Sequence, residues 1–160
     1  MGVISVNEEI SCSISPARMF SALILDAHNL MPKLLPQVIK SIEPISGEGG
    51  PGSIEQMNFT DASPIKFAKH RLDAVDQENF HCKYTMIESD ALGEKLEFIA
   101  YEVKFEASAD GGCTSKMTTN YHTKGDAEMK EEEINAGKEK SIGMYKIVEA
   151  YLTENPHVYA

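Results

Sequence analysis

Between residues 38 and 123 the chain alternates apolar and polar residues in short runs, and turn residues separate each run from the next. Alternation with a period of two predicts β-strands that bury one face. The connections are too short for the crossover that parallel strands require, so the strands must pair antiparallel. The predicted strands are Val38–Ile45, Ser53–Phe59, Ile65–Val75, Phe80–Glu88, Leu96–Ala107 and Thr114–Thr123.

One further strand and two short helices are predicted before residue 38. Val3–Ile10 mixes apolar and acidic residues at short spacing and reads as the first strand. Ser15 and Pro16 supply an N-cap and a first-turn proline for a helix that extends to Leu25. Asp26–Leu35 predicts a second helix, opened by an acidic cap and ended by Pro36. The two helices form a V between the first strand and the rest.

The C-terminal segment Glu128–Glu154 differs from the rest because its apolar residues follow helical spacing without an internal proline. It predicts one long helix. Gly137 and Gly143 each cost this helix about 1 kcal/mol relative to Ala, and together with Ser141 they indicate that space is left beside it. The 160 residues form a single domain, 1–160, in which a bent antiparallel sheet surrounds the helix.

The segment Gly47–Gly52, with the sequence GEGGPG, could be a phosphate-binding loop or a tight turn. A phosphate loop is followed by a Lys and a hydroxyl residue. Here Ser53-Ile54-Glu55-Gln56 follows, without a lysine. The interpretation is therefore a turn that requires positive φ angles.

Charge and cysteine content limit the partners and the compartment. The formal net charge is −10, with 15 basic residues against 25 acidic ones, so the protein repels a phosphate backbone and we expect no nucleic-acid partner. Cys12, Cys82 and Cys113 form no CxxC pair and indicate free thiols in a reducing compartment. No signal-peptide pattern or run of about 20 apolar residues occurs. We expect a cytoplasmic protein without membrane association.

The sequence contains no protease-like catalytic pattern, and its five histidines lack metal-ligand spacing. We expect neither a metal nor a cofactor. Alternation predicts inward faces that are apolar with polar side chains among them: Phe80, Cys82, Tyr84 and Met86 on one strand, Ile99, Tyr101, Val103 and Phe105 on the next. A buried tyrosine needs a hydrogen-bond partner for its hydroxyl. Tyr84 and Tyr101 are therefore either satisfied core residues or hydroxyls that face a ligand.

With these residues placed, the chain resembles the pathogenesis-related class-ten proteins of plants, the family of the major birch-pollen allergen. The resemblance covers essentially the whole chain, and its most specific stretches are LILDAHNLMPKLLPQVIKS, GEGGPGSI and DGGCTSKMTTNYHTKGD. It implies an α+β fold in which a seven-stranded curved antiparallel sheet, wrapped around a long C-terminal helix, encloses a hydrophobic cavity. Family members bind amphipathic plant molecules such as cytokinins, flavonoids, sterol-like hormones and fatty acids, and are induced by pathogens and stress.

The resemblance also implies which residues contact the ligand, in a protein that we expect to be a monomer. They lie on the first helix, on the strands and on the last helix. The implied residues are Leu23, Ile24, Met57, Phe59, Phe67, His70, Tyr84, Met86, Ile99, Tyr101, Ser141, Ile142 and Tyr145.

Two enzymatic alternatives remain open. Some family members are reported to cleave RNA, and the corresponding residues are Glu97, Glu149 and Tyr151, although Glu55-Gln56 stands where lysines are usual. Related norcoclaurine synthases use a cavity lysine, and Lys116 occupies the matching place. The alternation of the last strand turns Lys116 outward unless a bulge intervenes.

Overall fold

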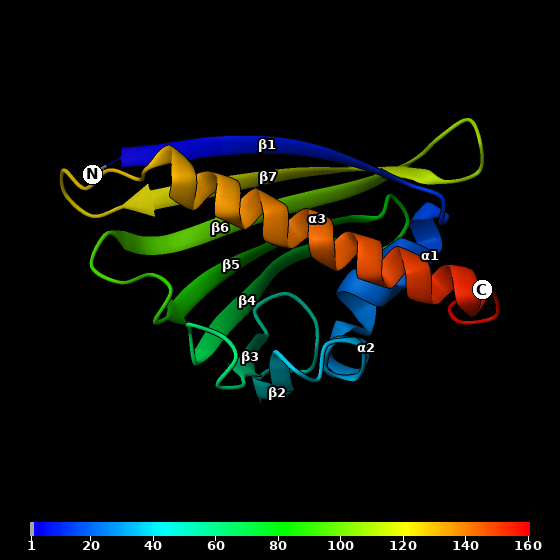
Figure 1. The fold of residues 1–160 in the computed structure, drawn as a ribbon, viewed down its shortest axis with the longest axis horizontal. Coiled ribbons are helices and arrows are strands. Elements are labelled where there is room, and N and C mark those ends of the chain that lie inside the picture. Colours follow the sequence, from blue (N-terminus) through cyan, green and yellow to red (C-terminus); the bar gives the residue numbers. More distant parts are fainter. Residues whose placement is uncertain (1) are drawn as a thin grey trace.

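The structure, a computed structural model that describes residues 2–160, is a curved seven-stranded antiparallel sheet crossed on its concave face by one long helix (Figure 1). The strands are β1 (Gly2–Cys12), β2 (Ile39–Ser46), β3 (Ile54–Phe59), β4 (Phe67–Asp76), β5 (His81–Ser89), β6 (Leu96–Ala107) and β7 (Cys113–Thr123). The helical segments are α1 (Pro16–Phe20), the π-helical η1 (Ser21–Leu25), α2 (Ala27–Leu34) and α3 (Glu131–Glu154). The α+β class, the long C-terminal helix and the two short helical regions agree with the sequence prediction.

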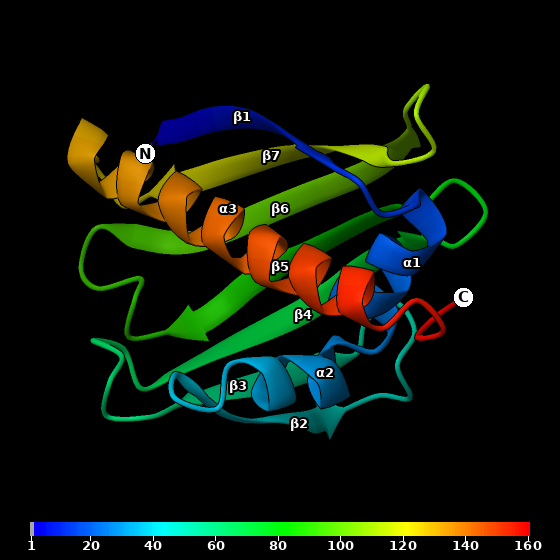
Figure 2. The ribbon, with the colours of Figure 1, turned by 45° about the vertical axis from the view of Figure 1, so that its right-hand side comes forward.

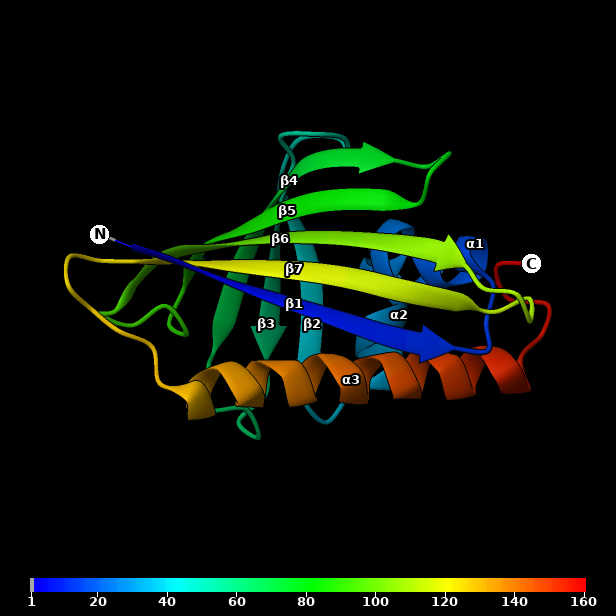
Figure 3. The same cartoon turned by 90° about the horizontal axis from the view of Figure 1, so that it is seen from above.

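The strand order β1-β7-β6-β5-β4-β3-β2 puts the first strand of the chain beside the last one. All neighbouring strands are antiparallel. Irregularities of register occur between β2 and β3, between β4 and β5, and between β6 and β7. Such irregularities bend the strands, and in Figure 3 strands β2 and β3 run across the direction of β1 and β7. The sheet therefore forms a trough rather than a flat layer.

The predicted first helix is present but changes its winding along its length. The side chain of Ser15 accepts a hydrogen bond from the amide of Arg18 at 3.4 Å, with Pro16 in the first turn, as the sequence predicts. From Ser21 to Leu25 the segment is π-helical. The acidic cap expected for α2 is wrong in detail, because the Asp26 carboxylate accepts from the side chain of Asn29 and not from the helix amides.

The C-terminal end of α3 is fixed to the first helix. The guanidinium group of Arg18 donates to the backbone carbonyls of Leu152, Asn155 and Val158, at 3.0, 2.9 and 3.0 Å. This cation therefore satisfies a carbonyl in the last turn of α3 and two carbonyls of the segment that follows it. Figure 2 shows the end of α3 beside α1, while the other end of α3 extends past the sheet near the start of β1.

Buried apolar side chains form two clusters on the concave face. The main cluster joins α1, the strands and the C-terminal half of α3, and its largest fully buried members are Phe20, Phe105, Met19, Leu152, Val103 and Val148. A smaller cluster of Ala68, Met86, Leu92, Leu96 and Ile99 fills the other end of the trough. Among residues 2–160 no helix is long and apolar enough to cross a membrane.

Candidate ligand-binding cavity

A cavity of about 400 Å³ lies in the trough, between α3, the segment from η1 to α2, and the strands. Its walls are mostly apolar, and the polar side chains come from α2, from the glycine loop and the start of β3, from strands β4 to β6 with the turn after β4, and from α3. The lining residues are Leu23, Ile24, Leu25, Ala27, His28, Met31, Ile42, Gly49, Ser53, Glu55, Met57, His70, Leu72, Val75, Gln77, Cys82, Tyr84, Tyr101, Val103, Met117, Met144 and Tyr145.

Three aromatic side chains gather on one wall of the cavity. Tyr84 on β5 and Tyr101 on β6 are directly opposite in the register, and their rings stack with centroids 4.8 Å apart. His70 on β4 sets its ring at steep angles to both, with centroids 5.7 Å from Tyr84 and 6.3 Å from Tyr101. Because these residues point to the same face of adjacent strands, the sheet fixes their relative positions.

The polar atoms of this aromatic group are neutral. Burial lowers the pKa of His70 from 6.5 to about 4, so its imidazole carries no charge at neutral pH. Burial also raises the pKa of the Tyr84 and Tyr101 hydroxyls above the ordinary value. Within residues 2–160 the three side chains have no hydrogen-bond partner, and all three line the cavity. A bound molecule could therefore donate to or accept from each of them.

Tyr145 differs from Tyr84 and Tyr101 because its hydroxyl has a hydrogen-bond partner within the protein. Its ring also borders the cavity, but its hydroxyl accepts a hydrogen bond from the buried Ser115 hydroxyl at 3.0 Å. The ring stacks on Phe105 with the centroids 6.2 Å apart. Tyr145 is therefore part of the packed interior, whereas the hydroxyls of Tyr84 and Tyr101 are available to a ligand.

The glycine loop forms one rim of the cavity and is a stiff turn, as the sequence predicts. Gly47, Gly49 and Gly52 have φ angles of 84, 96 and 92°. A Cβ on Gly47 would come within 2.5 Å of the Ser53 hydroxyl, so a side chain there is excluded. The amide of Gly49 donates to this hydroxyl, and the amide of Gly52 donates to the carbonyl of Leu72. These amides are used within the fold and do not form an open phosphate cradle.

Some of the residues implied by the resemblance meet at this cavity. They are Leu23, Ile24, Met57, His70, Tyr84, Tyr101 and Tyr145. That they contact a ligand stays a prediction.

The other implied residues, Phe59, Phe67, Met86, Ile99, Ser141 and Ile142, do not line the cavity. Met86 and Ile99 belong to the smaller cluster, because the inward faces of β5 and β6 continue past the cavity into the packed end of the trough. Phe59 packs against both clusters. Phe67 lies three residues from His70 and so faces the other side of β4.

The two residues implied on α3 also lie away from the cavity. Ile142 is 37% exposed, since the face of α3 that carries Tyr145 and Val148 turns it outward. Ser141 is half-buried. Gly143 is exposed with open space around it, whereas a Cβ on Gly137 would lie 3.1 Å from the hydroxyl of Tyr121. The Tyr121 hydroxyl therefore occupies the space beside Gly137, the space beside Gly143 is on the exposed side of the helix, and neither glycine lines the cavity.

Several lining residues were not expected from the sequence. Alternation already placed Cys82 and Val103 on inward faces, and it turns Met117 inward because it turns the adjacent Lys116 outward, so the strand pattern could have identified all three. Glu55 is on β3, two residues before Met57, so alternation could have identified it as well. His28 and Met31 reach the cavity because α2 folds over the trough. No local pattern signals that approach, since it depends on how distant segments pack.

Comparison with known proteins identifies the family. The sequence matches the model of the Pathogenesis-related protein Bet v 1 family over residues 1–155. The chain belongs to the Bet v 1 family. It is 52% identical to the pathogenesis-related protein STH-2 of Solanum tuberosum over 160 residues, with both chains fully covered. It is 47% identical to the major allergen Pru av 1 of Prunus avium over 159 residues, which cover 99% of each chain.

Solved structures show the same fold. The crystal structure of Ara h 8.0201 superposes with a TM-score of 0.85 at 35% identity, and the match covers 96% of this chain and 99% of that one. Norcoclaurine synthase from Thalictrum flavum superposes with a TM-score of 0.73 at 21% identity, over 96% and 88% of the two chains. At that identity the synthase shows the fold alone.

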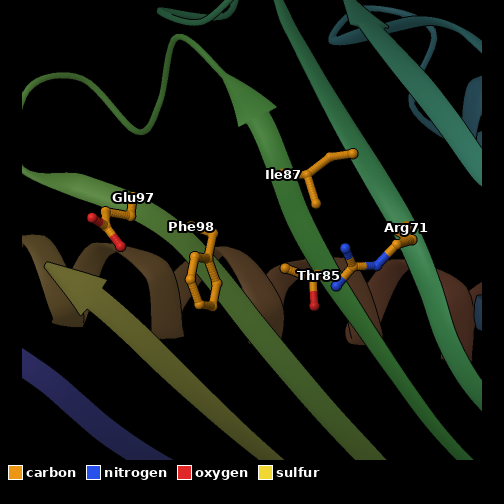
Figure 4. A pocket seen from close by; sticks show the side chains of 5 residues that line it. All are labelled: Arg71, Thr85, Ile87, Glu97 and Phe98. Carbon is orange, nitrogen blue, oxygen red and sulfur yellow. The ribbon is translucent and has the colours of Figure 1, made fainter.

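In this member of the Bet v 1 family the three ribonuclease candidates do not form one site. Glu97 is exposed at a shallow pocket of about 210 Å³ on the outer face of the sheet, and Figure 4 shows α3 behind the strands that carry it. Glu149 accepts hydrogen bonds from the amide and hydroxyl of Ser13 at 2.5 and 3.1 Å. The hydroxyl of Tyr151 accepts from Lys33 at 3.1 Å. The sheet separates Glu97 from the two helix residues.

Lys116, the candidate for a synthase activity, also lies outside the cavity. Its ammonium group is 2.9 Å from the Glu106 carboxylate, and its side chain is 49% exposed. Met117 and Ser115, its neighbours in β7, are buried. The outward orientation that alternation predicts for Lys116 is confirmed.

Proposed function

We propose that the protein binds one small amphipathic plant molecule in this cavity, of the cytokinin, flavonoid, sterol-like or fatty-acid kind. In the plant it would serve as a stress- or defence-related carrier or hormone buffer. The observation that carries the proposal is the group of His70, Tyr84 and Tyr101, three neutral hydrogen-bonding side chains without protein partners on an otherwise apolar wall.

The dimensions and walls suit one small ligand. Ligand pockets typically enclose about 300–1,000 Å³, and 400 Å³ lies toward the lower end of that range. Four methionines, Met31, Met57, Met117 and Met144, line the walls. Their unbranched, polarisable side chains adapt to ligands of different outline. Shape would then select the apolar part of the ligand, and the aromatic group would orient its polar end.

The charges of the lining favour neutral ligands over anionic ones. Within residues 2–160 the lining includes no lysine or arginine, while Glu55 places a carboxyl group at the glycine-loop rim. An ionised carboxylate buried without a cationic partner is costly. Neutral hydroxylated or aminated molecules should therefore bind more tightly at neutral pH than a fatty acid with an ionised head group.

Displacement of an uncharged hydrophobic fluorophore tests this proposal. The dye should gain fluorescence on binding, and a cytokinin, a flavonoid or a sterol should displace it at lower concentration than a fatty acid. Ala27→Phe, which adds a ring at the cavity wall, should weaken dye binding. Ala150→Phe makes the same change at an exposed position of α3 and should leave it unchanged.

Two results would count against the proposal. One is that none of the four ligand classes displaces the dye or raises the melting temperature. The other is equal dye binding by the two phenylalanine variants, which would place the dye outside the cavity. Circular dichroism of both variants checks that the fold is retained.

A further inference from the structure

Two cysteine side chains meet at the end of the β1–β7 pair, away from the ligand cavity. Cys12 is the last residue of β1 and Cys113 the first of β7, and they are directly opposite in the register although 101 positions separate them in the sequence. Their sulfur atoms are 3.1 Å apart. Both are free thiols.

The backbone around this pair already has the geometry of a disulfide. Residues directly opposite in antiparallel strands have Cα atoms about 4.5 or 5.5 Å apart. Both values lie within the range of about 4.4–6.8 Å that disulfides span. Bond formation requires the sulfur atoms to approach by about 1 Å, to the S–S distance of about 2.05 Å. Small side-chain rotations can supply that movement without shifting the strands.

The two thiols differ in exposure and in pKa. These differences suit Cys12 to attack a disulfide and Cys113 to resolve the mixed disulfide that forms. Cys12 is half-buried, so a small molecule can reach it, while Cys113 is fully buried. A hydrogen bond from the Cys113 thiol lowers the pKa of Cys12 to about 7, against the opposing effects of burial and of the nearby Glu149 carboxylate. The same hydrogen bond and burial raise the pKa of Cys113. Cys12 therefore forms thiolate, the nucleophilic form, more readily than an ordinary cysteine does.

We propose that Cys12 and Cys113 form a redox-active dithiol whose substrates are low-molecular-weight disulfides of the glutathione class. The Cys12 thiolate attacks one sulfur of glutathione disulfide, the S–S bond breaks, and one glutathione thiolate leaves and takes up a proton. Cys113 then loses its proton and attacks the Cys12 sulfur of the mixed disulfide, which releases the second glutathione. Two protein thiols are oxidised to one disulfide, and one glutathione disulfide is reduced to two thiols.

The third cysteine provides an internal contrast. Cys82 lies on the cavity wall, is 1% exposed, and has its pKa raised to about 12 by burial. It has neither the access nor the thiolate fraction of Cys12, so it should stay reduced. A metal site is a poor alternative for the cysteine pair, because residues 2–160 hold no group of three His, Cys, Asp or Glu side chains able to bind an ion.

The disulfide would change the stability of the region where the sheet meets α3. Ser13, next to Cys12, donates its amide to Glu149 on α3. A covalent link from β1 to β7 at this point closes a loop of about one hundred residues in the unfolded chain, which restricts the unfolded state. The oxidised protein should melt at a higher temperature than the reduced protein.

Peptide mapping of the protein after incubation with glutathione disulfide tests the proposal. We expect one Cys12–Cys113 linkage, a mass loss of two hydrogen atoms, one remaining thiol, and full reversal by dithiothreitol. Cys113→Ser, which keeps a hydrogen-bond donor beside Cys12 but cannot resolve the mixed disulfide, should stop at the first step and carry glutathione on Cys12. Cys12→Ala should stay unmodified, and Cys82→Ala should form the same linkage as the unchanged protein.

Three outcomes would overturn the proposal. They are a stable glutathione adduct on Cys12 in the unchanged protein, a linkage between two protein molecules, and no reaction at any ratio of glutathione disulfide to glutathione. The map of the unchanged protein decides between these outcomes and the proposed linkage even if a cysteine variant fails to fold.

Discussion

The interior beneath α3 has a filled region and a hollow region on the same face of the same strands. In the filled region Phe20, Phe105 and Leu152 are at most 1% exposed, and the first two rings meet edge to face with centroids 6.2 Å apart. In the hollow region the wall that carries Tyr84 and Tyr101 borders about 400 Å³ of space. Strands β5 and β6 contribute to both regions, so their alternation alone does not decide which one forms.

The difference comes from what the helices place opposite the strands. In the filled region α1 supplies Met19 and Phe20, and the C-terminal half of α3 supplies Val148 and Leu152. At the hollow region the described residues of α3 that reach the wall are Met144 and Tyr145, while Ile142 is turned outward. We therefore expect stability to depend on the filled region and ligand affinity on the hollow one. Three predictions test that division, in decreasing order of their effect on the free energy of unfolding.

Leu152→Ala should cause the largest loss of stability. Leu152 is fully buried in the main cluster, and removal of a large core side chain leaves a cavity that the surroundings fill only partly. The expected loss is about 2–5 kcal/mol in the free energy of unfolding, measured by urea denaturation. Dye affinity of the folded protein should change little, because Leu152 does not line the cavity.

Leu23→Ala is the matched control, since it makes the same change in a helical segment but at the cavity wall. Part of the Leu23 surface already faces space, so fewer packing contacts are lost and the loss should be clearly smaller than at Leu152. Dye affinity should change instead. Equal destabilisation by the two variants would show that the two regions do not differ in packing as described.

His70 should make the hollow region sensitive to acid. Its pKa is about 4 when folded, against 6.5 ordinarily, so between these values the unfolded chain binds a proton that the folded chain does not. Stability therefore falls as the pH decreases from about 6.5 to about 4. Below pH 4 both states bind the proton, so His70 causes no further change of stability with pH. The contribution is at most about 3 kcal/mol, reduced by whatever water enters the cavity.

His70→Phe removes the titrating group and keeps an aromatic ring. Urea denaturation at several pH values should show a shallower decrease toward pH 4 for this variant than for the unchanged protein. His157→Phe, at an exposed position, should retain the original slope. If His70→Phe also showed the same decrease of stability toward pH 4 as the unchanged protein, the imidazole would be solvated in the folded state and the cavity would be open to water at His70.

The fold could be predicted almost entirely from the sequence. Leu96–Ala107 matches β6 residue for residue, and the last residue of α3, Glu154, is as expected. These elements depend on local periodicity and on glycines at turns. The start of α3 was placed three residues early, at Glu128 instead of Glu131, because acidic residues are compatible with the first turn and with the loop before it.

The candidate site was only partly predictable for the same physical reason. Alternation identifies which strand residues face inward, as it did for Tyr84 and Tyr101, but it does not reveal whether a helix fills the space opposite them. Met86 and Ile99 satisfy the same pattern and are packed instead. The contact between Cys12 and Cys113 likewise depends on the pairing of β1 with β7, which no local spacing encodes.

Tyr84→Phe should have the smallest effect on stability and a clear effect on binding. Because the Tyr84 hydroxyl has no partner within residues 2–160, its removal should change the free energy of unfolding by less than about 1.5 kcal/mol, the most that one hydrogen bond usually contributes. A ligand polar atom that pairs with this hydroxyl would lose about 1–3 kcal/mol, or roughly tenfold or more in affinity. A purely apolar ligand should bind the variant as before. Dye displacement by both ligand types measures the contrast.

Tyr145→Phe is the matched control, because it removes a hydroxyl that is bonded within the fold. Its loss leaves the buried Ser115 hydroxyl without a partner, which should cost about 1–3 kcal/mol of stability. The affinity ratio between polar and apolar ligands should stay the same. Tyr84→Phe could instead lose as much stability as Tyr145→Phe and leave the affinity ratio equally unchanged. The hydroxyl of Tyr84 would then have a hydrogen-bond partner within the folded chain. The hollow region would then lack the polar group that orients a ligand, and the recognition assigned to that wall would have to be carried by His70 and Tyr101 alone.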